Sequence, residues 1–249
     1  QLAFKPLDDR ARDPSAHMDH LLALIDRFGG PRPARDAQHH FAEIGRARVK
    51  WERHTEFISY TFYRDGAAEA PFALPLESVA PADWLAEAPG ALLSAIRFHI
   101  EENEDRAAAE AAVRDRLARH FVRESYVAAH VGRGHATVIG DFRIHEDGFT
   151  RFAVLSGPNA GSRRLGRIVQ RLIEVETYRL LSMLALPMAR EMSARLNSVE
   201  AELTALISAF SAESRRDEEM LADLVRLSAA IEAESAETAF RFAASKAYA

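Results

Sequence analysis

Residues 192–210, with the sequence MSARLNSVEAELTALISAF, decide the fold of the second half of this chain. Six apolar side chains recur in this stretch at alternating intervals of four and three residues: Met192, Leu196, Val199, Leu203, Leu206 and Phe210. A mean spacing of 3.5 residues is typical of a helix that packs along its length against a partner helix. The six residues therefore predict a helix-packing seam, which lies either within one chain or between the subunits of an oligomer.

The same rhythm returns in phase at Met220, Leu224, Leu227 and Ile231. Between the two stretches, polar residues occupy the seam positions. No glycine or proline ends the helical pattern before Ala249. We therefore expect a hairpin or bundle of long helices, and we expect the chain to be a fragment of a longer protein.

From residue 1 to about residue 161, strand signals alternate with helix signals. Strands are expected at 48–64, 93–100, 126–131, 136–144 and 149–155, and helices at 18–28 and 104–121. This order predicts an α+β fold: an antiparallel sheet with flanking helices on one face, followed by long helices that form a coiled-coil-like hairpin or bundle. We expect an α+β domain over 1–161 and a long-helix domain over 162–249 that is truncated at its C-terminal end.

The chain of 249 residues carries 32 basic and 37 acidic side chains, which gives a formal net charge of −5. This balance does not favour nucleic acid as a partner. The absence of cysteine excludes disulfides, thiolate metal sites and thiol nucleophiles. Because no run of 18 apolar residues is present, the sequence predicts no membrane-spanning helix.

One expected strand concentrates ionisable side chains, in the sequence KWERHTEF at 50–57. Glu52, His54 and Glu56 alternate along it and would share one face, where two carboxylates and an imidazole suit a divalent cation. The competing interpretation, a solvated or helix-covered sheet face, is favoured because no second cluster with ligand spacing supports a site. The ten histidines lack zinc-binding motifs and are expected on the surface.

Several phrases of the sequence resemble a bacterial protein family. They are FAEIG at 41–45, KWERHTEF at 50–57, DFR at 141–143, GF at 148–149, GR at 166–167, VQRL at 169–172, ETYR at 176–179, FRF at 240–242 and AY at 247–248. The chain is thereby identified as a member of domain of unknown function family 3422, whose members are described as membrane-anchored. The resemblance brings no activity and no catalytic residues. It implies membrane attachment through segments absent from this sequence, with the fragment at the cytoplasmic face of the bacterial inner membrane.

Three functions remain open at this point. The preferred one is a non-enzymatic cytosolic portion of a membrane-anchored protein, which acts through helix packing and forms a homo-oligomer. An alternative is the regulatory head of a CorA-like divalent-cation transporter, with Glu52 and Glu56 as ion sensors. The third is a small-metabolite enzyme that uses His54 as a general base between these two carboxylates. No cofactor other than a divalent cation is expected.

Overall fold

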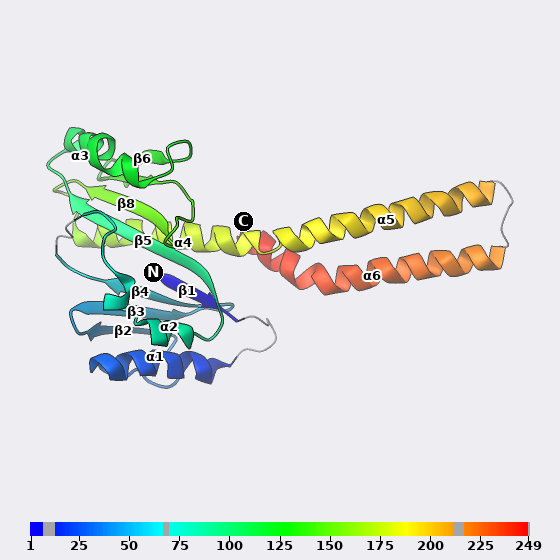
Figure 1. The fold of residues 1–249 in the computed structure, drawn as a ribbon, viewed down its shortest axis with the longest axis horizontal. Coiled ribbons are helices and arrows are strands. Elements are labelled where there is room, and N and C mark those ends of the chain that lie inside the picture. The colour runs from blue at the N-terminus through cyan, green and yellow to red at the C-terminus, as the bar shows by residue number, and fades with distance from the viewer. Residues whose placement is uncertain (7–12, 67–69, 212–216, 249) are drawn as a thin grey trace. The chain divides into compact units, whose positions relative to one another are not determined.

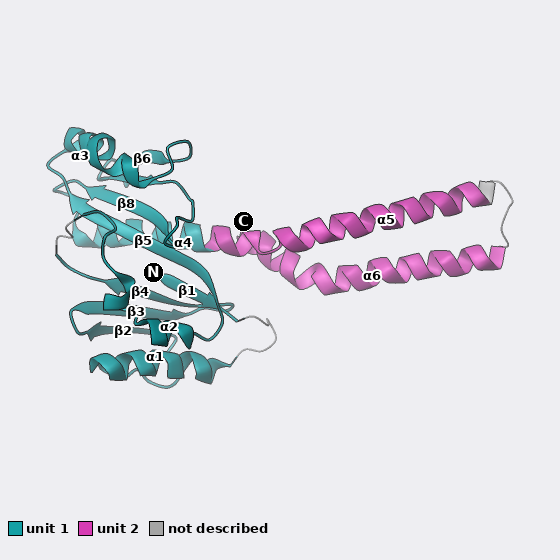
Figure 2. Ribbon diagram, viewed as in Figure 1, with its two compact units in different colours: residues 1–177 teal, residues 178–249 magenta. Residues whose placement is uncertain are grey.

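The computed structural model describes residues 1–6, 13–66, 70–211 and 217–248. The chain divides into two compact units, residues 1–177 and residues 178–249 (Figure 2). The first unit holds the sheet and the helices that cover it, and the second holds the long helices. The α+β fold class is confirmed.

One eight-stranded sheet runs through the described part of the first unit (Figure 1). Its strands are β1 (Leu2–Lys5), β2 (His39–Ile44), β3 (Ala47–Arg53), β4 (Ile58–Tyr63), β5 (Ala91–Glu102), β6 (Val127–Val131), β7 (Ala136–Gly140) and β8 (Thr150–Ser156). Their order across the sheet is β2-β3-β4-β1-β5-β8-β7-β6. The short strand β1 therefore lies in the middle, antiparallel to both β4 and β5. The pair β5 and β8 is parallel, so the sheet is mixed rather than antiparallel throughout.

The described helices of the first unit are short, apart from α1 and α4. They are α1 (Pro14–Phe28), η1 (Leu76–Ser78), α2 (Ala82–Ala86), α3 (Arg106–Ala112), the π-helical η2 (Val113–Leu117), η3 (Ala118–His120) and α4 (Ser162–Met183), whose C-terminal end continues into the second unit. Local chemistry sets the ends of α1. The Asp13 side chain accepts a hydrogen bond from the Ser15 amide, and Gly29 ends the helix in the left-handed conformation with φ 72°.

Three clusters of buried apolar side chains hold the helices on the sheet. The first joins α1 and Trp84 of α2 to β1, β2, β3 and β4. The second packs α4 on β5, β7 and β8, through Ile168, Val169 and Ile173. The third packs α3 and η2 on β7 and β8, around Leu117 and Ile139. Helices therefore cover both faces of the β8-β7 part of the sheet, not one face as the sequence suggested.

The expected single strand over 48–64 is wrong, because the chain turns back within it. β3 ends at Arg53 and β4 begins at Ile58, and the two strands pair antiparallel, with Glu52 opposite Ser59. The His54 amide donates to the Phe57 carbonyl across 2.9 Å and closes the turn. Residues 54–57 include no glycine, proline or asparagine that would indicate a turn. The two strands on either side of the turn were therefore predicted as one continuous strand.

The second unit consists of two long helices, α5 (Leu186–Ser211) and α6 (Asp217–Tyr248), preceded by the end of α4. Pro187 is the second residue of α5, where a proline ring fits because the amides of the first turn need no partner within the helix. The two helices lie side by side and run antiparallel (Figure 2). The long helices expected from the heptad rhythm are thus present.

Candidate functional site

Every second residue of the predicted seam packs between α5 and α6. Leu206 of α5 is buried against Met220 and Leu227 of α6, and Val199 packs on the same cluster. Nearer to the start of α5, the sulfur of Met192 lies 3.8 Å from the Thr238 hydroxyl. Residues seven apart, 192, 199 and 206, therefore form the row that faces the partner helix.

The alternate seam residues lie outside this contact. Leu196 is 47% exposed and Leu203 is 39% exposed, while Leu224 and Ile231 of α6 are 43% and 44% exposed. Leu221, one position after the buried Met220, is 63% exposed. The side chain of Phe210 lies outside the described residues. We call the five residues Leu196, Leu203, Leu221, Leu224 and Ile231 the apolar flank.

The apolar flank occupies one side of the hairpin. In an antiparallel helix pair, positions four residues after the buried row turn to the same side of both helices. Leu196 and Leu203 stand four residues after Met192 and Val199, and Leu224 and Ile231 stand four residues after Met220 and Leu227. The flank is therefore a continuous apolar surface shared by α5 and α6.

Ion pairs occupy the opposite side of the hairpin. Arg226 of α6 contacts Glu202 of α5 at 2.7 Å, and Arg195 of α5 bonds to Glu234 of α6. Arg195 also contacts Glu191 one turn earlier at 2.6 Å. Polar contacts within the chain thus hold one side of the hairpin, whereas the other side presents leucine and isoleucine.

The predicted metal ligands Glu52, His54 and Glu56 are split between a strand and a turn. Glu52 lies on β3 and forms a 2.8 Å ion pair with Lys50. His54 lies in the turn, where its ring stacks on Phe57 at 4.1 Å, and Glu56 is buried. Within the described ranges, no group of three or more histidine, aspartate or glutamate side chains could hold a metal ion. The ion-sensor and enzyme hypotheses at these residues stay predictions.

Helix α4 supplies the neighbours of this strand face. Gln170 of α4 accepts a 3.4 Å hydrogen bond from Lys50 and donates at 3.0 Å to Glu174. Burial lowers the pKa of His54, and the carboxylates of Glu52 and Glu174 oppose this without reversing it. The face is thus a partly covered polar surface in which Lys50 and Glu52 neutralise each other.

Two histidines belong to the core, contrary to the expectation that they lie on the surface. His17 and His20 are buried on the inner side of α1. The Nε2 atom of His20 lies 3.0 Å from the Trp84 carbonyl, which can only accept, so Nε2 carries the proton. The Nδ1 atom then accepts from the Tyr60 hydroxyl at 2.8 Å. The neutral ring also stacks on Trp84 at 4.2 Å and ties α1 to α2.

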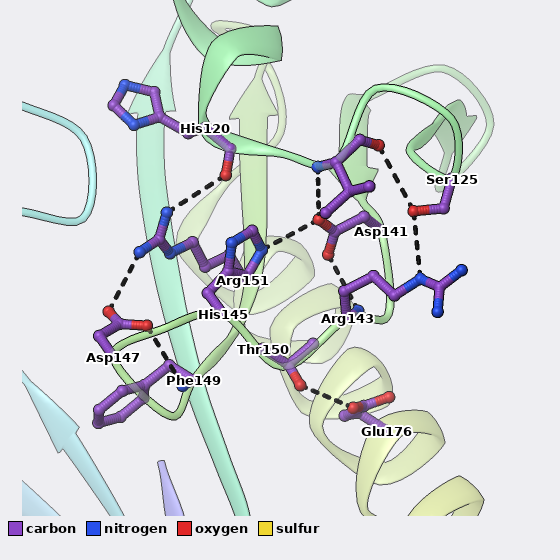
Figure 3. Close-up of polar contacts among 11 residues, drawn as sticks. His120, Ser125, Asp141, Arg143, His145, Asp147, Phe149, Thr150, Arg151 and Glu176 are labelled. Carbon is purple, nitrogen blue, oxygen red and sulfur yellow. Dashed lines mark hydrogen bonds and ion pairs between the residues drawn. The ribbon is translucent and has the colours of Figure 1, made fainter.

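A second polar network surrounds the connection between β7 and β8 (Figure 3). The Asp141 carboxylate is fully buried and accepts from the backbone amides of Val122 at 2.9 Å and Arg143 at 3.1 Å. The Nε2 atom of His145 lies 3.0 Å from the same carboxylate. Phe142, between these residues, has a positive φ of 53°, a conformation that costs free energy for a side chain of this size. Asp141 therefore fixes a strained loop.

Asp147, in the loop before β8, and Arg151, on β8, form further polar contacts beside this loop (Figure 3). Arg151 contacts Asp147 at 3.2 Å and donates to the His120 carbonyl at 3.3 Å. Arg97, its register partner on β5, lies 3.8 Å from Asp147 and stacks on the Phe149 ring at 4.2 Å. Partial burial raises the pKa of Asp147, but the hydrogen bond and charge of Arg151 outweigh it and hold this pKa below its usual value.

A third contact in the same region joins β8 to α4. Thr150 donates to Glu176 across 2.9 Å, and both side chains are fully buried (Figure 3). The network connects β7, β8, α4 and the loop after η3, and its arrangement suits a structural frame. Sequence reasoning missed it because its members are scattered from residue 97 to residue 176.

Comparison with known proteins bears on the whole chain. Residues 1–249 match the family described as protein of unknown function, DUF3422. The chain belongs to this family. The resemblance expected from the quoted phrases, among them DFR at 141–143 in the loop of Figure 3, is thereby confirmed. No curated protein and no solved structure matches the chain of this DUF3422 member.

Among the described residues of this DUF3422 chain, no helix is both long enough and apolar enough to cross a bilayer.

Proposed function

We propose that this protein works without chemistry of its own, as an assembly module in which the α5–α6 hairpin binds the hairpin of a second copy. The apolar flank carries this proposal. Its five leucine and isoleucine residues are each between 39% and 63% exposed on one side of the helix pair. Contiguous exposed apolar surface of this kind marks interaction sites in soluble proteins.

The distribution of polar and apolar residues along α6 supports the proposal that a partner covers the apolar flank. The row that contains Leu224 and Ile231 continues at Thr238 and Ser245, which are both buried. The row is thus polar where it is buried and apolar where it is exposed. Solvent exposure alone would favour the reverse distribution. The exposed part of the row, Leu224 and Ile231, therefore has the apolar composition expected of a buried surface.

The sequence period points to the same conclusion. A strict pair of helices needs one narrow apolar seam, whereas helices of a bundle carry an additional apolar position beside it. Leu221 and Leu224 extend the buried position of Met220 in this way. Four helices, two from each copy, would bury the flank on both hairpins.

A second copy is the occupant that the surface fits best. A single self-complementary patch is what a two-fold dimer requires, because the same surface meets itself. The charged side chains of the opposite side are already paired within the chain, so charge does not select a different partner. Two such flanks would bury on the order of 1,000 Å² in total, the area at which specific interfaces begin.

Light scattering on the purified chain tests the proposal. We expect a molar mass of twice the 27.7 kDa monomer at micromolar concentration. The double variant Leu203→Gln with Leu224→Gln should give the monomer mass, because two amides would be buried without partners. The matched control, Ala205→Gln with Ala222→Gln, places the same side chains at exposed positions away from the flank and should remain dimeric.

Two results would overturn the proposal. One is a monomer at concentrations up to 100 times the expected dissociation midpoint, set at about 1 μM. The other is an oligomer whose mass is unchanged by the Leu203 and Leu224 substitutions, which would place the interface elsewhere. Far-UV circular dichroism of both double variants checks that the helices remain folded.

Attachment to the cytoplasmic face of the bacterial inner membrane belongs to the same proposal. Its support is the resemblance of the sequence to a family whose members are described as membrane-anchored. Fractionation of cells that express the protein tests it. The protein should sediment with membranes and resist extraction by alkaline carbonate, and recovery in the soluble fraction would contradict this part of the proposal.

A further inference from the structure

A cavity of about 190 Å³ opens at one end of the β2-β3-β4 part of the sheet. Four segments that are distant in the sequence enclose it: the last residue of α1, the β2–β3 turn, the residue after β4, and the end of η1. Phe28, Ile44, Ala47 and Val79 supply apolar walls. Ile44 and Val79 are almost fully buried, so this part of the cavity surface is fixed by the core.

Two arginines stand at the rim of this cavity. Arg46 lies in the two-residue turn between β2 and β3, and Arg64 directly follows β4. Ile44 pairs with Ala47 and Arg48 pairs with Tyr63, so both arginines lie at the same end of strands β2, β3 and β4. Gly45, with φ 57°, allows the tight turn that places Arg46 there.

These two arginines differ from others of the first unit in their contacts. Arg27, Arg32 and Arg48 each lie 2.6 Å from an aspartate. For Arg46 and Arg64, no carboxylate lies within ion-pair distance among the residues that the structure describes. Ser78, also at the rim, already donates its hydroxyl proton to the Pro75 carbonyl across 2.7 Å. The donors left for a ligand are therefore the two guanidinium groups.

We infer that this cavity binds a small organic monocarboxylate, with its carboxylate between Arg46 and Arg64 and its apolar body against Phe28, Ile44 and Val79. The planar guanidinium group presents parallel N–H donors that match a carboxylate. An apolar cavity of about 150 Å³ holds a benzene ring, so the space here suits a single ring or a chain of about six carbons. An inorganic anion would leave the apolar walls without contact.

Isothermal titration of the whole chain tests the inference with benzoate and hexanoate as probes. We expect both to bind in the micromolar to millimolar range. Benzamide has the shape of benzoate without its charge and should bind at least about tenfold more weakly, as expected for the loss of charge-assisted hydrogen bonds. Inorganic phosphate reports the contribution of charge alone and should also bind at least about tenfold more weakly than benzoate.

Arg46→Gln and Arg64→Gln should each weaken benzoate binding by at least about tenfold. Both positions are exposed, so the fold should tolerate the change, and an unchanged melting temperature checks this. Arg163→Gln removes an exposed arginine that does not line the cavity and should leave binding unchanged.

Four outcomes would overturn the inference. They are no heat with either carboxylate at 10 mM, equal affinity for benzoate and benzamide, equal affinity for benzoate and phosphate, or equal losses in the Arg163 and Arg46 variants. None of these depends on self-association, because the variants lie in the first unit and the oligomeric mass is measured separately.

Discussion

Arg226 of α6 donates from its Nη2 atom to the Oε2 atom of Glu202 on α5 across 2.7 Å. This ion pair links the two helices on the side of the hairpin that faces away from the apolar flank. Both side chains are about half exposed, so solvent screens the pair and it adds little to stability. The ion pair accompanies the packing of Leu206 against Met220 between the helices. Leu203 and Leu224 are exposed on the side of the hairpin opposite to the ion pair.

Truncation of the buried row should open the hairpin. Leu206→Ala removes three carbon atoms from a side chain that is only 7% exposed, and we expect a cost of about 2–4 kcal/mol. Hydrogen exchange of the α5 and α6 amides measures this as lost protection. Val225→Ala, at a position that is 60% exposed, is the control and should change protection by less than about 0.5 kcal/mol. Equal effects of the two substitutions would contradict the packing of Leu206 between the helices.

Removal of the Thr150 hydroxyl should destabilise the first unit. Thr150→Val keeps the shape of the side chain but takes a donor from the buried Glu176 carboxylate, which should cost about 1–3 kcal/mol. Urea unfolding gives this free energy. Thr150→Ser retains the hydroxyl and should be closer to the natural protein, so a serine variant less stable than the valine variant would refute the role given to this hydrogen bond.

Gly140 should tolerate no side chain while Phe152 is opposite. A Cβ atom at Gly140 would overlap the ring of Phe152, its register partner on β8. Gly140→Ala therefore forces the ring or the strand to move, at a cost of about 1–3 kcal/mol in the free energy of unfolding, measured in urea. In the background Phe152→Leu, the same substitution should cost less. An additive double variant would show that this contact does not limit residue 140.

The stability of the first unit should fall in mild acid. Burial lowers the pKa of His20, so the unfolded chain binds a proton at a higher pH than the folded chain does. The contribution is complete above the unfolded value of 6.5 and is lost progressively as the pH falls toward the lowered folded value. His17, His54 and His120 shift in the same direction.

Urea unfolding at pH 7.5, 6.5 and 5.5 measures this dependence. His20→Gln should flatten the slope of stability against pH, whatever its effect on absolute stability. His39→Gln, which changes an exposed histidine on β2, should leave the slope unchanged. A His20→Gln slope as steep as that of the natural protein would show that this ring is not the group that titrates.

Part of the candidate sites was accessible from the sequence. The heptad spacing of the seam, which includes Met192, Val199 and Leu206, is a local property of helix geometry, so the spacing of apolar residues is enough to locate the long helices and their apolar residues. The turn at 54–57 was not accessible, because its residues have no turn signature and the strand alternation of apolar residues passes through it. The Asp141 network and the Arg46–Arg64 cavity were also missed, since their members lie in different elements.

The sequence by itself determined that the second half forms long helices with apolar residues at heptad spacing, because helical period depends only on neighbouring residues. It also determined the family and the α+β class. Only the tertiary structure decided that the row of Leu206 is buried and the row of Leu203 exposed, that β1 lies at the centre of the sheet, and that β5 pairs parallel with β8. These outcomes depend on contacts between residues far apart in the chain, and such contacts are selected by the packing of the whole core rather than by any local pattern.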